Sequence, residues 1–491
     1  MPMKININKE KSKKQLSRPW TFGINTCHAK LWLRDDLPRH AKIASEKCGF
    51  KYVRFHNILS EDLGVYTENE KGDPIVCFEK FDLIFDKVIA CGYLPFFEIS
   101  FCPPKLSSGD GRICFYKADI TVPNSFAKWS YLIEKIAEHV IERYGIGCVE
   151  KWYFEVWNEP DIFFDGTIED YFELYDYTAC AIKRVNKNLR VGGPATSKCL
   201  WIKEFIEHIE AGSEVTGYKS VPCDFISTHA YPSDLAFLDG DYSDVSLQSS
   251  NVMRKLYSRV RELTDNSSLR GKPVIMGEWN SSAGPLAENH DEKNNGAYIV
   301  KILDDVKDII DGSLYWNLSD IYEEPGFHYT PFHGGYGLFN VNDIPKSSFN
   351  AFFLLNKLDG SEPEVFWENK KSGIGAIAAD KDGVLRILLY YYKEPDEKVS
   401  DEKESIEIEI TGIKSETAVC RISSVDSEGG SPYELWNSTG RADYVNAEIL
   451  NHLSAASELH KSSKILHKNA AYYTLTEQLE QGDIKLLEIM Y

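Results

Sequence analysis

The 491-residue sequence lacks several features that would place it in a specialised class of protein. It has no run of the roughly 18 consecutive apolar residues that a membrane-spanning helix requires. Basic residues are too few to balance acidic ones, since 55 Lys and Arg against 75 Asp and Glu give a formal net charge of −20. Such a charge repels phosphate backbones and anionic lipids, so we expect neither nucleic acid nor a membrane as a partner.

The 11 cysteines include no Cys-x-x-Cys pair, which argues against a zinc knuckle or a thioredoxin-type motif. His28 and His328 have no partners at metal-ligand spacing, so we expect neither a metal nor a cofactor. Reduced thiols used as small apolar side chains are the expected state. The first residues, MPMKININKEKSKKQLSRPW, are polar and basic without an apolar stretch, so no secretory signal is visible and a cytoplasmic location is expected.

Hydrophobic residues make up 43% of the chain and charged residues 26%, which is typical of a folded globular protein. Up to about residue 320, short apolar runs rich in β-forming residues alternate with helical patterns. Near-continuous apolar runs are typical of strands that are covered on both faces. The strand candidates are 21–26, 52–57, 94–99, 152–157, 190–193, 225–231, 273–280 and 313–320.

The segments between these candidates show helical periodicity. The apolar residues between Phe81 and Ile89 recur at i, i+3, i+4, i+7 and i+8, which is one stripe of a helix running into Gly92. Eight strand–helix units predict an α/β fold, a TIM (β/α)8 barrel, over residues 17–345. An open doubly wound sheet is the alternative, although no glycine-rich dinucleotide fingerprint follows any early strand.

After residue 345 the pattern changes to alternating, strand-like runs such as GIGAIAAD, VLRILLYYY and SIEIEITGI. Polar turns separate them, and together they predict a C-terminal β-sandwich domain over residues 346–491. The segment 447–464 is partly helical and interrupts this pattern. The run MKINI near the N-terminus is a further strand candidate, and we expect residues 1–16 to join the sandwich.

Chemistry in such barrels takes place where strands end at the C-terminal face. Two carboxylates are found there: Glu159 ends the fourth candidate strand in WNEP, and Glu278 ends the seventh in MGEWN. A single glutamate at a strand end is usually solvated or paired with a cation. Two of them, each beside Trp and Asn and three strands apart in a ring of eight, have the arrangement that glycosidic bond cleavage needs.

Cleavage of an acetal requires one protonated and one ionised carboxyl group. An ionised Glu278 disfavours ionisation of Glu159, which leaves Glu159 as a usable acid. Tyr231, on the neighbouring strand, is placed to donate a hydrogen bond to Glu278, and Arg54 to keep it ionised. Asn158 is expected to direct its amide at the sugar 2-hydroxyl.

Other candidates allow two interpretations. Glu98, at the end of the third strand, either lines the pocket or pairs with Arg54. His333, in the segment PFHGG, either holds a glycine turn or contacts substrate at the pocket rim. Asn-x-Ser/Thr occurs at Asn280 and Asn317, where a glycan would block the predicted site, and this favours a compartment without glycosylation.

Six segments occur in order along the chain: RFHNILSEDLGVY, VWNEPD, GGPATS, FISTHAY, GEWNSS and TPFHGGYGL. Over about residues 20–355, this pattern resembles the family-39 glycoside hydrolases, the β-xylosidase and α-L-iduronidase family within the clan of retaining barrel glycosidases. TPFHGGYGL, with Asp320, Glu323 and Glu324 just before it, looks more like the β-xylosidase branch.

The resemblance implies that Glu159 is the acid/base and Glu278 the nucleophile. Where the family's nucleophile segment is often TEYN-like, this chain has Trp279 after Glu278, a departure that concerns the neighbouring subsite. The other positions that match family residues shaping the sugar site, or that stand at the pocket, are Asn158, His229, Tyr231, Arg54, His56, Trp316 and Glu323 or Glu324.

The function implied is that of a retaining, exo-acting β-xylosidase that releases xylose from short xylo-oligosaccharides by double displacement. Its two carboxyl groups are expected to lie about 5–5.5 Å apart. The resemblance also implies a homo-oligomer, a tetramer. The alternatives are a β-galactosidase, an α-L-arabinopyranosidase or an α-L-iduronidase, and, in a different class, a non-catalytic carbohydrate-binding barrel, which would be expected to lack one carboxylate.

Overall fold

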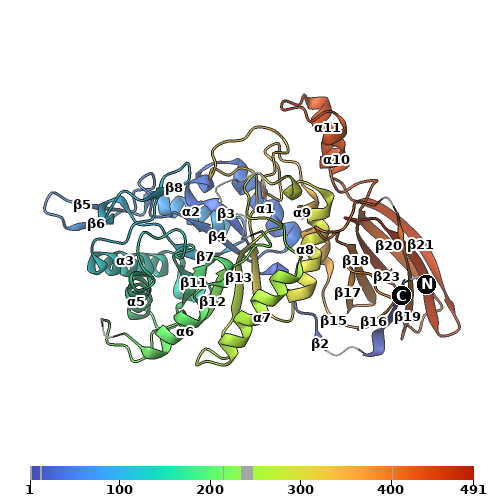
Figure 1. The fold of residues 1–491 in the computed structure, drawn as a ribbon, viewed down its shortest axis with the longest axis horizontal. Coiled ribbons are helices and arrows are strands. Elements are labelled where there is room, and N and C mark those ends of the chain that lie inside the picture. The colour runs from blue at the N-terminus through green and yellow to red at the C-terminus, as the bar shows by residue number, and fades with distance from the viewer. Residues whose placement is uncertain (1–2, 12–13, 214, 234–246, 401) are drawn as a thin grey trace.

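The structure is a computed structural model of the chain, and it describes residues 3–11, 14–213, 215–233, 247–400 and 402–491. The chain forms two parts that lie side by side (Figure 1). One is a barrel of alternating strands and helices, and the other is a β-sheet domain made mostly of the C-terminal segment.

Eight parallel strands form a closed barrel, in the order β3-β4-β7-β10-β11-β12-β13-β14, and β14 pairs again with β3. Each strand candidate of the first 320 residues corresponds to one of these strands, so the predicted TIM (β/α)8 barrel is confirmed. The strands are β3 (Gly23–His28), β4 (Tyr52–His56), β7 (Leu94–Ile99), β10 (Tyr153–Val156), β11 (Arg190–Thr196), β12 (Phe225–His229), β13 (Val274–Trp279) and β14 (Gly312–Tyr315).

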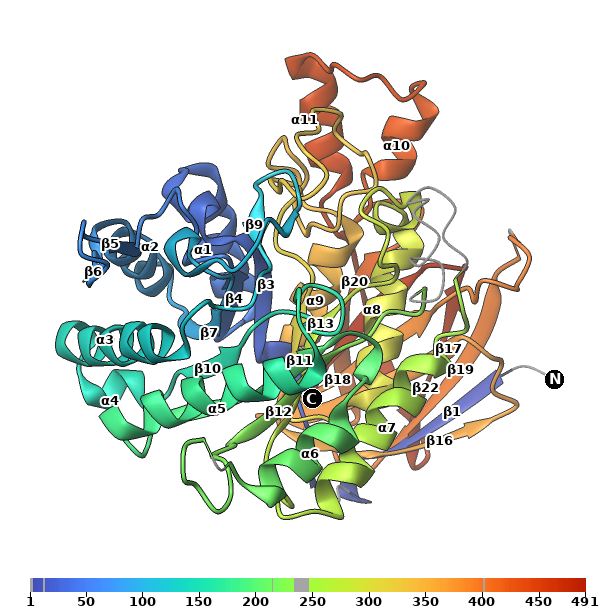
Figure 2. The ribbon, with the colours of Figure 1, turned by 60° about the vertical axis from the view of Figure 1, so that its left-hand side comes forward.

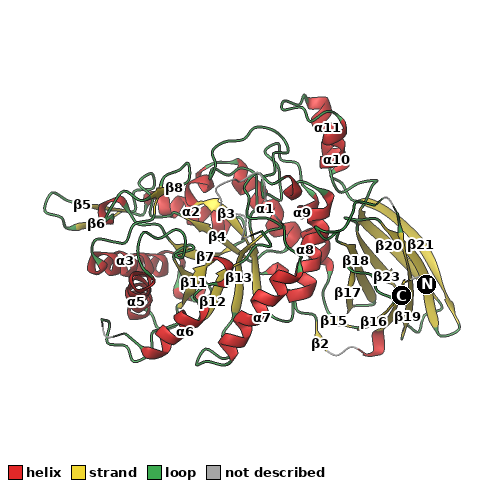
Figure 3. Cartoon of the chain, viewed as in Figure 1, coloured by secondary structure: helices red, strands yellow, loops and turns green. Residues whose placement is uncertain are grey.

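Amphipathic helices surround the barrel (Figure 3). In α2, the stripe between Phe81 and Ile89 is buried apart from the partly exposed Ile89. Thr167 and Asp170 form a capping box that starts α5. The helices are α1 (Asp36–Cys48), α2 (Glu79–Ala90), α3 (Phe126–Tyr144), α4 (Ile146–Val149), α5 (Ile168–Val185), α6 (Ile202–Ala211), α7 (Asn251–Asp265), α8 (Lys293–Val306) and α9 (Ser347–Lys357).

Helix α9 begins after residue 345, where the sequence pattern predicts the barrel to end, and it packs against α1 and α8. The barrel's last helix is therefore formed by residues from the far side of the predicted boundary. The boundary was placed at residue 345 because the alternation of strands and helices is lost there. It is lost because a long loop separates β14 from α9, the helix that follows it.

The interior of the barrel changes in character along its axis. At one end, an apolar plug is formed by residues from seven positions in or next to the strands, namely Phe22, Tyr52, Phe96, Tyr153, Phe225, Ile275 and Leu314. Above the plug lie buried charged and polar side chains, among them Arg54, Glu98 and Glu155, which are all fully buried. Buried charge of this kind is costly unless it is paired, so this layer is a candidate for function.

The second part is an 11-stranded sheet in the order β16-β1-β19-β22-β21-β20-β23-β18-β17-β15-β2. Its two halves enclose an apolar core that includes Ile5, Ile408, Ile387 and Leu487, which confirms the predicted sandwich. Strand β1 lies between β16 and β19. The strands are β1 (Met3–Asn8), β2 (Lys14–Gln15), β15 (Ser361–Glu362), β16 (Glu364–Glu368), β17 (Ile374–Lys381), β18 (Val384–Tyr391), β19 (Glu404–Thr411), β20 (Thr417–Val425), β21 (His460–Asn469), β22 (Tyr472–Leu479) and β23 (Ile484–Met490).

Smaller elements extend from both parts. The chain segment that connects β20 to β21 contains helices α10 (Tyr433–Ser438) and α11 (Ala447–Ala456), which project as an arm (Figure 2). This arm packs on Phe332 of the loop after β14. Two hairpins, β5 (Tyr66–Glu68) with β6 (Pro74–Val76) and β8 (Arg112–Ile113) with β9 (Ala118–Asp119), extend the loops after β4 and β7. None of the described helices combines the length and apolar character that a bilayer crossing requires.

Candidate active site

A pocket of about 650 Å³, including its opening to solvent, lies at the C-terminal ends of the barrel strands. This volume is in the range of sites that bind a small molecule. The residues that line it are His56, Asn158, Glu159, Ile162, Phe163, Ser197, Lys198, Tyr231, Glu278, Ala283, Trp316, Glu324 and Tyr336.

Most residues selected from the sequence are brought together here. Two of the others, Arg54 and His229, lie beneath the pocket and contact the side chains that line it. Glu323 does not line the pocket, because its carboxylate accepts from His28 Nε2 at 2.9 Å. Of the two adjacent glutamates that the sequence left open, the structure therefore places only Glu324 in the pocket.

Glu159 and Glu278 face each other across the pocket. Glu159 follows β10, Glu278 lies in β13, and an oxygen of one carboxyl group lies within 4.8 Å of an oxygen of the other. Each residue is only 7% exposed. His229, at the end of β12, lies between them, with Nδ1 at 3.0 Å from Glu159 Oε1 and 3.8 Å from Glu278 Oε2. The two carboxyl groups can thus contact a single bound group.

Hydrogen bonds hold the segment around Glu159 in a strained backbone conformation. The φ of Glu159 is +45°, a left-handed conformation that is uncommon for non-glycine residues. Its backbone N–H donates to Ala195 O at 2.9 Å, which ties the loop after β10 to the end of β11. The indole of Trp157 donates to Phe163 O at 2.7 Å and closes the same loop on itself.

Arg54 is fully buried, and it contacts more carboxylates than the sequence suggested. Its Nε donates to Glu155 at 2.6 Å, and one of its terminal nitrogens lies 2.8 Å from Glu98. The contact with Glu278 is longer, at 3.4 Å. Of the two interpretations of Glu98 from the sequence, the structure supports pairing with Arg54 rather than a position in the pocket lining. Burial raises the pKa of Glu98 to about 8, and the charge of Arg54 opposes this shift.

Arg54 also fixes the orientation of Asn158. A guanidinium can only donate hydrogen bonds, and its terminal nitrogen lies 2.8 Å from Asn158 Oδ1. The amide NH2 of Asn158 is therefore turned away from Arg54, and Asn158 lines the pocket. The side chain thus presents two donors to whatever binds there.

Glu278 receives its strongest hydrogen bond from Tyr231, whose hydroxyl donates to Oε1 at 2.7 Å. This contact was predicted from the neighbouring positions of the two strands. Burial raises the pKa of Glu278, and the charge of Glu159 raises it further, whereas Arg54 and the Tyr231 hydrogen bond lower it. Burial also lowers the pKa of His229 to about 4, so this ring is neutral at neutral pH.

The side of the pocket opposite Lys198 is formed by His56, Trp316 and Glu324. The rings of His56 and Trp316 lie 5.5 Å apart, and Glu324 Oε1 is 3.7 Å from His56 Nε2. Burial lowers the pKa of His56 well below its ordinary value, and Arg54 lowers it further, so His56 is neutral. Burial raises the pKa of Glu324 well above its ordinary value, and the charges of Glu278 and Glu159 add to this shift.

A hairpin loop that the sequence did not indicate closes this side. The hydroxyl of Tyr116, between β8 and β9, lies 2.7 Å from His56 Nε2, and the Tyr116 ring stacks on His28. The backbone N–H of Phe115 donates to Glu324 O at 2.9 Å. No pattern in the sequence predicts this contact, because a short hairpin in a loop has no periodicity that relates it to a distant strand.

Other functional residues were also missed. Glu155 is the closest carboxylate to Arg54, and the available signal was its presence inside the apolar strand WYFEVW. Ile162, Phe163, Ser197 and Lys198 form the pocket wall next to Glu159. Ile162 and Phe163 follow VWNEPD, so proximity to the predicted acid was the signal that could have identified them. Ser197 ends GGPATS and Lys198 follows it, so their signal was their position just after a predicted strand.

The glycine turn near His333 is held by buried charges rather than by that histidine. Lys346 bonds Asp291 at 2.5 Å and Asp320 at 2.6 Å, and all three are essentially inaccessible to solvent. The two aspartates in turn accept from the backbone N–H groups of Gly334 and Gly337. A Cβ at residue 337 would lie 2.3 Å from the backbone nitrogen of Asp320, so only glycine fits there.

His333 and Trp279 lie away from the pocket lining. His333 Nδ1 bonds Thr330 O at 3.0 Å. Trp279 is fully buried and packs edge-on against Tyr315 in the layer between strands and helices. Successive residues of a strand point to opposite faces, so the residue after Glu278 faces away from the pocket. The departure from the TEYN-like segment therefore does not reach the neighbouring subsite.

Comparisons with known proteins agree with this geometry. The family model described as glycosyl hydrolases family 39 matches residues 3–472. The chain belongs to family 39. A beta-xylosidase of Caldicellulosiruptor saccharolyticus is 37% identical over 466 residues, which are 94% of this chain and 92% of that protein.

Two further relatives span nearly the whole chain. A beta-xylosidase of Geobacillus stearothermophilus is 31% identical, covering 99% of this chain and 95% of that one. The crystal structure of a monomeric beta-xylosidase from Caulobacter crescentus CB15 superposes with a TM-score of 0.89 at 29% identity and covers 99% of both chains. The two-part architecture is thus shared with a solved structure from end to end.

Proposed function

We propose that this protein is a retaining, exo-acting β-xylosidase that removes xylose from short xylo-oligosaccharides. The observation that carries the proposal is the pair Glu159 and Glu278, whose oxygens approach within 4.8 Å in one pocket. Retaining glycosidases hold their carboxyl groups about 5–5.5 Å apart, whereas inverting enzymes need about 6.5–9.5 Å to admit a water molecule. The observed approach supports the retaining geometry.

In the first step, Glu278 attacks the anomeric carbon while Glu159 protonates the departing oxygen. Ionised Glu278 is favoured by the Tyr231 hydroxyl at 2.7 Å and by Arg54 at 3.4 Å. The charge on Glu278 disfavours ionisation of Glu159, which keeps the proton available for the leaving group.

In the second step, Glu159 acts as a base toward water, which attacks the glycosyl-enzyme and releases the sugar with its configuration retained. The negative charge returns to Glu278, where the Tyr231 hydrogen bond stabilises it. Asn158 has its NH2 group free of Arg54 and is placed for the sugar 2-hydroxyl, a contact that strengthens in the transition state.

The two sides of the pocket suit different parts of the substrate. The leaving group lies next to the acid, so the wall of Ile162, Phe163 and Lys198 faces the aglycone. The sugar itself lies toward His56, Trp316 and Glu324. There, the hairpin with Tyr116 and the loop after β14 meet through Phe115 and close the pocket, which supports exo action.

Charge distinguishes the xylosidase from one family-39 alternative. An iduronidase needs a cation for the C5 carboxylate of its substrate. Among the described lining residues, Lys198 is the one with a permanent positive charge, and it lies on β11's side of the pocket rather than near Glu324. A neutral His56 and the carboxyl group of Glu324 disfavour a carboxylated sugar.

The β-galactosidase and α-L-arabinopyranosidase alternatives are tested by a panel of aryl glycosides, with the anomeric configuration of the first product followed by NMR. We expect the β-xyloside to be preferred and its configuration retained. Preference for a hexoside would overturn the substrate assignment, and inversion would overturn the mechanism. A non-catalytic barrel is tested with Glu278→Ala, because loss of a nucleophile removes several kcal/mol of transition-state stabilisation, whereas unchanged turnover would exclude Glu278 from that role.

We also propose that the protein acts inside the cell as a homo-oligomer. Free cysteines at 11 positions suit a reducing compartment. Asn280 and Asn317 are buried at the site, and Asn280 bonds Trp316 O, so a glycan on either would not fit. Cell fractionation tests the location, and light scattering with the purified chain tests for the tetramer; secretion in the first case, or a monomer in the second, would contradict the proposal.

A further inference from the structure

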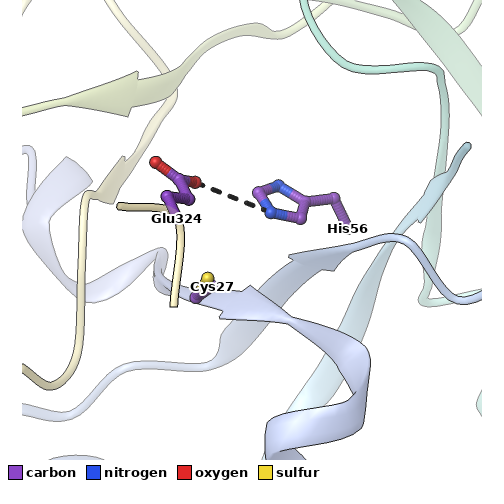
Figure 4. Close-up of side chains that lie close together, drawn as sticks. All are labelled: Cys27, His56 and Glu324. Atoms are coloured by element: carbon purple, nitrogen blue, oxygen red, sulfur yellow. Dashed lines mark ion pairs between the residues drawn. The ribbon is translucent and has the colours of Figure 1, made fainter. Parts of the chain in front are cut away.

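Three side chains of the kinds that ligate metals point toward one another on the sugar side of the pocket (Figure 4). Cys27 belongs to β3, His56 ends β4, and Glu324 lies in the loop after β14, and these three strands are neighbours in the barrel. The thiol sulfur, an imidazole nitrogen and a carboxylate oxygen all lie within 4.8 Å of one another. The proposed hydrolysis places His56 and Glu324 toward the sugar, but it does not require a thiol beside them.

The separation of two of the three ligands is close to that in a tetrahedral site. His56 Nε2 and Glu324 Oε1 are 3.7 Å apart. Nitrogen and oxygen ligands lie about 2.0–2.2 Å from Zn²⁺, so two ligands of a tetrahedral site are about 3.4 Å from each other. The distance between these two atoms of His56 and Glu324 would therefore have to shorten by only a few tenths of an ångström. Thiolate and imidazole select zinc rather than magnesium or calcium, which prefer oxygen ligands.

The pocket gives an ion access to these three side chains, and a fourth ligand is also close. His56 and Glu324 line the pocket, and the Glu324 side chain is 26% exposed, so an ion can enter by the route that the sugar takes. Cys27, at 2% exposure, lies behind them and completes the site from below. The Tyr116 hydroxyl, 2.7 Å from His56 Nε2, can bond a water molecule on the ion or occupy the fourth position itself.

The charge around the pocket favours a cation. The described lining residues include three carboxyl groups, those of Glu159, Glu278 and Glu324. Arg54 is the cation beneath them, and its closest bond, at 2.6 Å, goes to a different carboxylate, that of Glu155. A divalent ion at Glu324 would be attracted by the negative charge of the nearby Glu278 in a site largely shielded from solvent.

We propose that Cys27, His56 and Glu324 form a Zn²⁺ site, and that an ion bound there excludes the sugar and inhibits the enzyme. Binding forms bonds from the ion to sulfur, nitrogen and oxygen, and the protons of the thiol and of the carboxyl group pass to solvent. The proposal goes beyond the hydrolytic function, and only its effect on turnover depends on that function.

Binding is tested without any activity measurement. Calorimetric titration of the full chain with Zn²⁺ should give one site that releases protons, and Co²⁺ should give the near-ultraviolet charge-transfer absorption of a cobalt–thiolate bond. Cys27→Ser and Cys27→Ala should both abolish this absorption and weaken Zn²⁺ binding by roughly tenfold or more. The matched control is Cys102→Ser, a buried thiol at the same end of the barrel that lies outside the cluster.

Inhibition gives a second readout on an aryl xyloside. Zn²⁺ is expected to compete with substrate, with activity restored by EDTA, and the Cys27 variants are expected to keep basal activity and lose sensitivity to zinc. The group of Glu159, His229 and Glu278 also has ligand atoms within 4.8 Å of one another. Zinc inhibition that persists in the Cys27 variants, without cobalt–thiolate absorption in the wild type, would place the ion there and overturn the proposal, as would the absence of zinc binding.

Discussion

Replacing Tyr231 with phenylalanine removes one hydroxyl group and leaves the ring in place. That hydroxyl donates to Glu278 Oε1 at 2.7 Å, and it is the shortest hydrogen bond that the structure gives to this carboxyl group. The other nearby donor, Arg54, lies 3.4 Å from Glu278 and also bonds Glu155 at 2.6 Å. Tyr231 is therefore the closest hydrogen-bond donor to Glu278, and Arg54 stabilises the same charge from a longer distance.

The size of the effect follows from the charge on the acceptor. A hydrogen bond to an ionised group contributes about 1.5–3 kcal/mol, which corresponds to about 10- to 150-fold in rate. In the second step of the proposed mechanism, Glu278 departs from the sugar and regains its negative charge. The Tyr231 hydrogen bond strengthens in that transition state, so hydrolysis of the glycosyl-enzyme is the step expected to slow by this factor.

Stopped-flow measurements with an activated aryl xyloside test the prediction. Tyr231→Phe is expected to release a burst of phenol before a slow steady state, because the intermediate accumulates. The hydrogen bond lowers the pKa of Glu278, so its removal raises that pKa further and moves the acidic limb of the kcat/KM profile to higher pH. Kcat within about twofold of wild type, together with an unmoved acidic limb, would refute the reasoning.

The control for this experiment is Tyr257→Phe. The Tyr257 hydroxyl donates to the backbone oxygen of Thr228 at 2.9 Å, on the strand that precedes Tyr231, and it does not line the pocket. Both variants lose a buried hydrogen bond, so both are expected to be less stable. Only the variant at Tyr231 is expected to show the burst and the shifted limb.

Three further predictions concern single residues. Glu159→Ala is expected to lose about 10²–10⁴-fold in kcat/KM on xylobiose but much less on activated aryl xylosides, with azide restoring turnover; equal losses on both would contradict its role as the acid. Asn158→Ala is expected to lose roughly tenfold or more in kcat/KM on a xyloside and little on the 2-deoxy analogue; equal losses would exclude the contact with the 2-hydroxyl. Burial raises the pKa of Glu324, so the contribution of this residue to the stability of the wild type falls as pH rises above the ordinary glutamate value of about 4.3, and Glu324→Gln lacks this pH-dependent contribution. Urea unfolding at about pH 5 and about pH 8 is expected to show the variant's relative stability increasing with pH, and an unchanged difference would contradict the raised pKa.

Strand positions and the two carboxylates were readable from the sequence because both depend on local pattern. A strand covered on both faces is typically a run of apolar residues, and most of the eight barrel strands have one. Glu159 and Glu278 stand at the ends of such runs, and in a parallel barrel all strand ends meet on one face. The contact between Tyr231 and Glu278 followed in the same way, because their strands are neighbours.

Contacts across the barrel could not be read in this way. Arg54 was expected to stabilise Glu278, with Glu98 as an alternative partner, but its shortest bond goes to Glu155. The side chain enters the interior from β4 and contacts the carboxylates that project at the same height. The choice between Glu323 and Glu324 was likewise not accessible. Both lie in a loop without periodicity, and only the position of His28 directs Glu323 away from the pocket.

The amino-acid order by itself determined the barrel, the sandwich and the two residues proposed to act on the sugar, because periodicity and strand ends depend on residues close together in the chain. The tertiary structure alone decided how charge is shared beneath the pocket, how Asn158 is oriented, and that Cys27 meets His56 and Glu324. These outcomes depend on the register of strands and the course of loops that are distant in sequence. A local pattern carries no information about either.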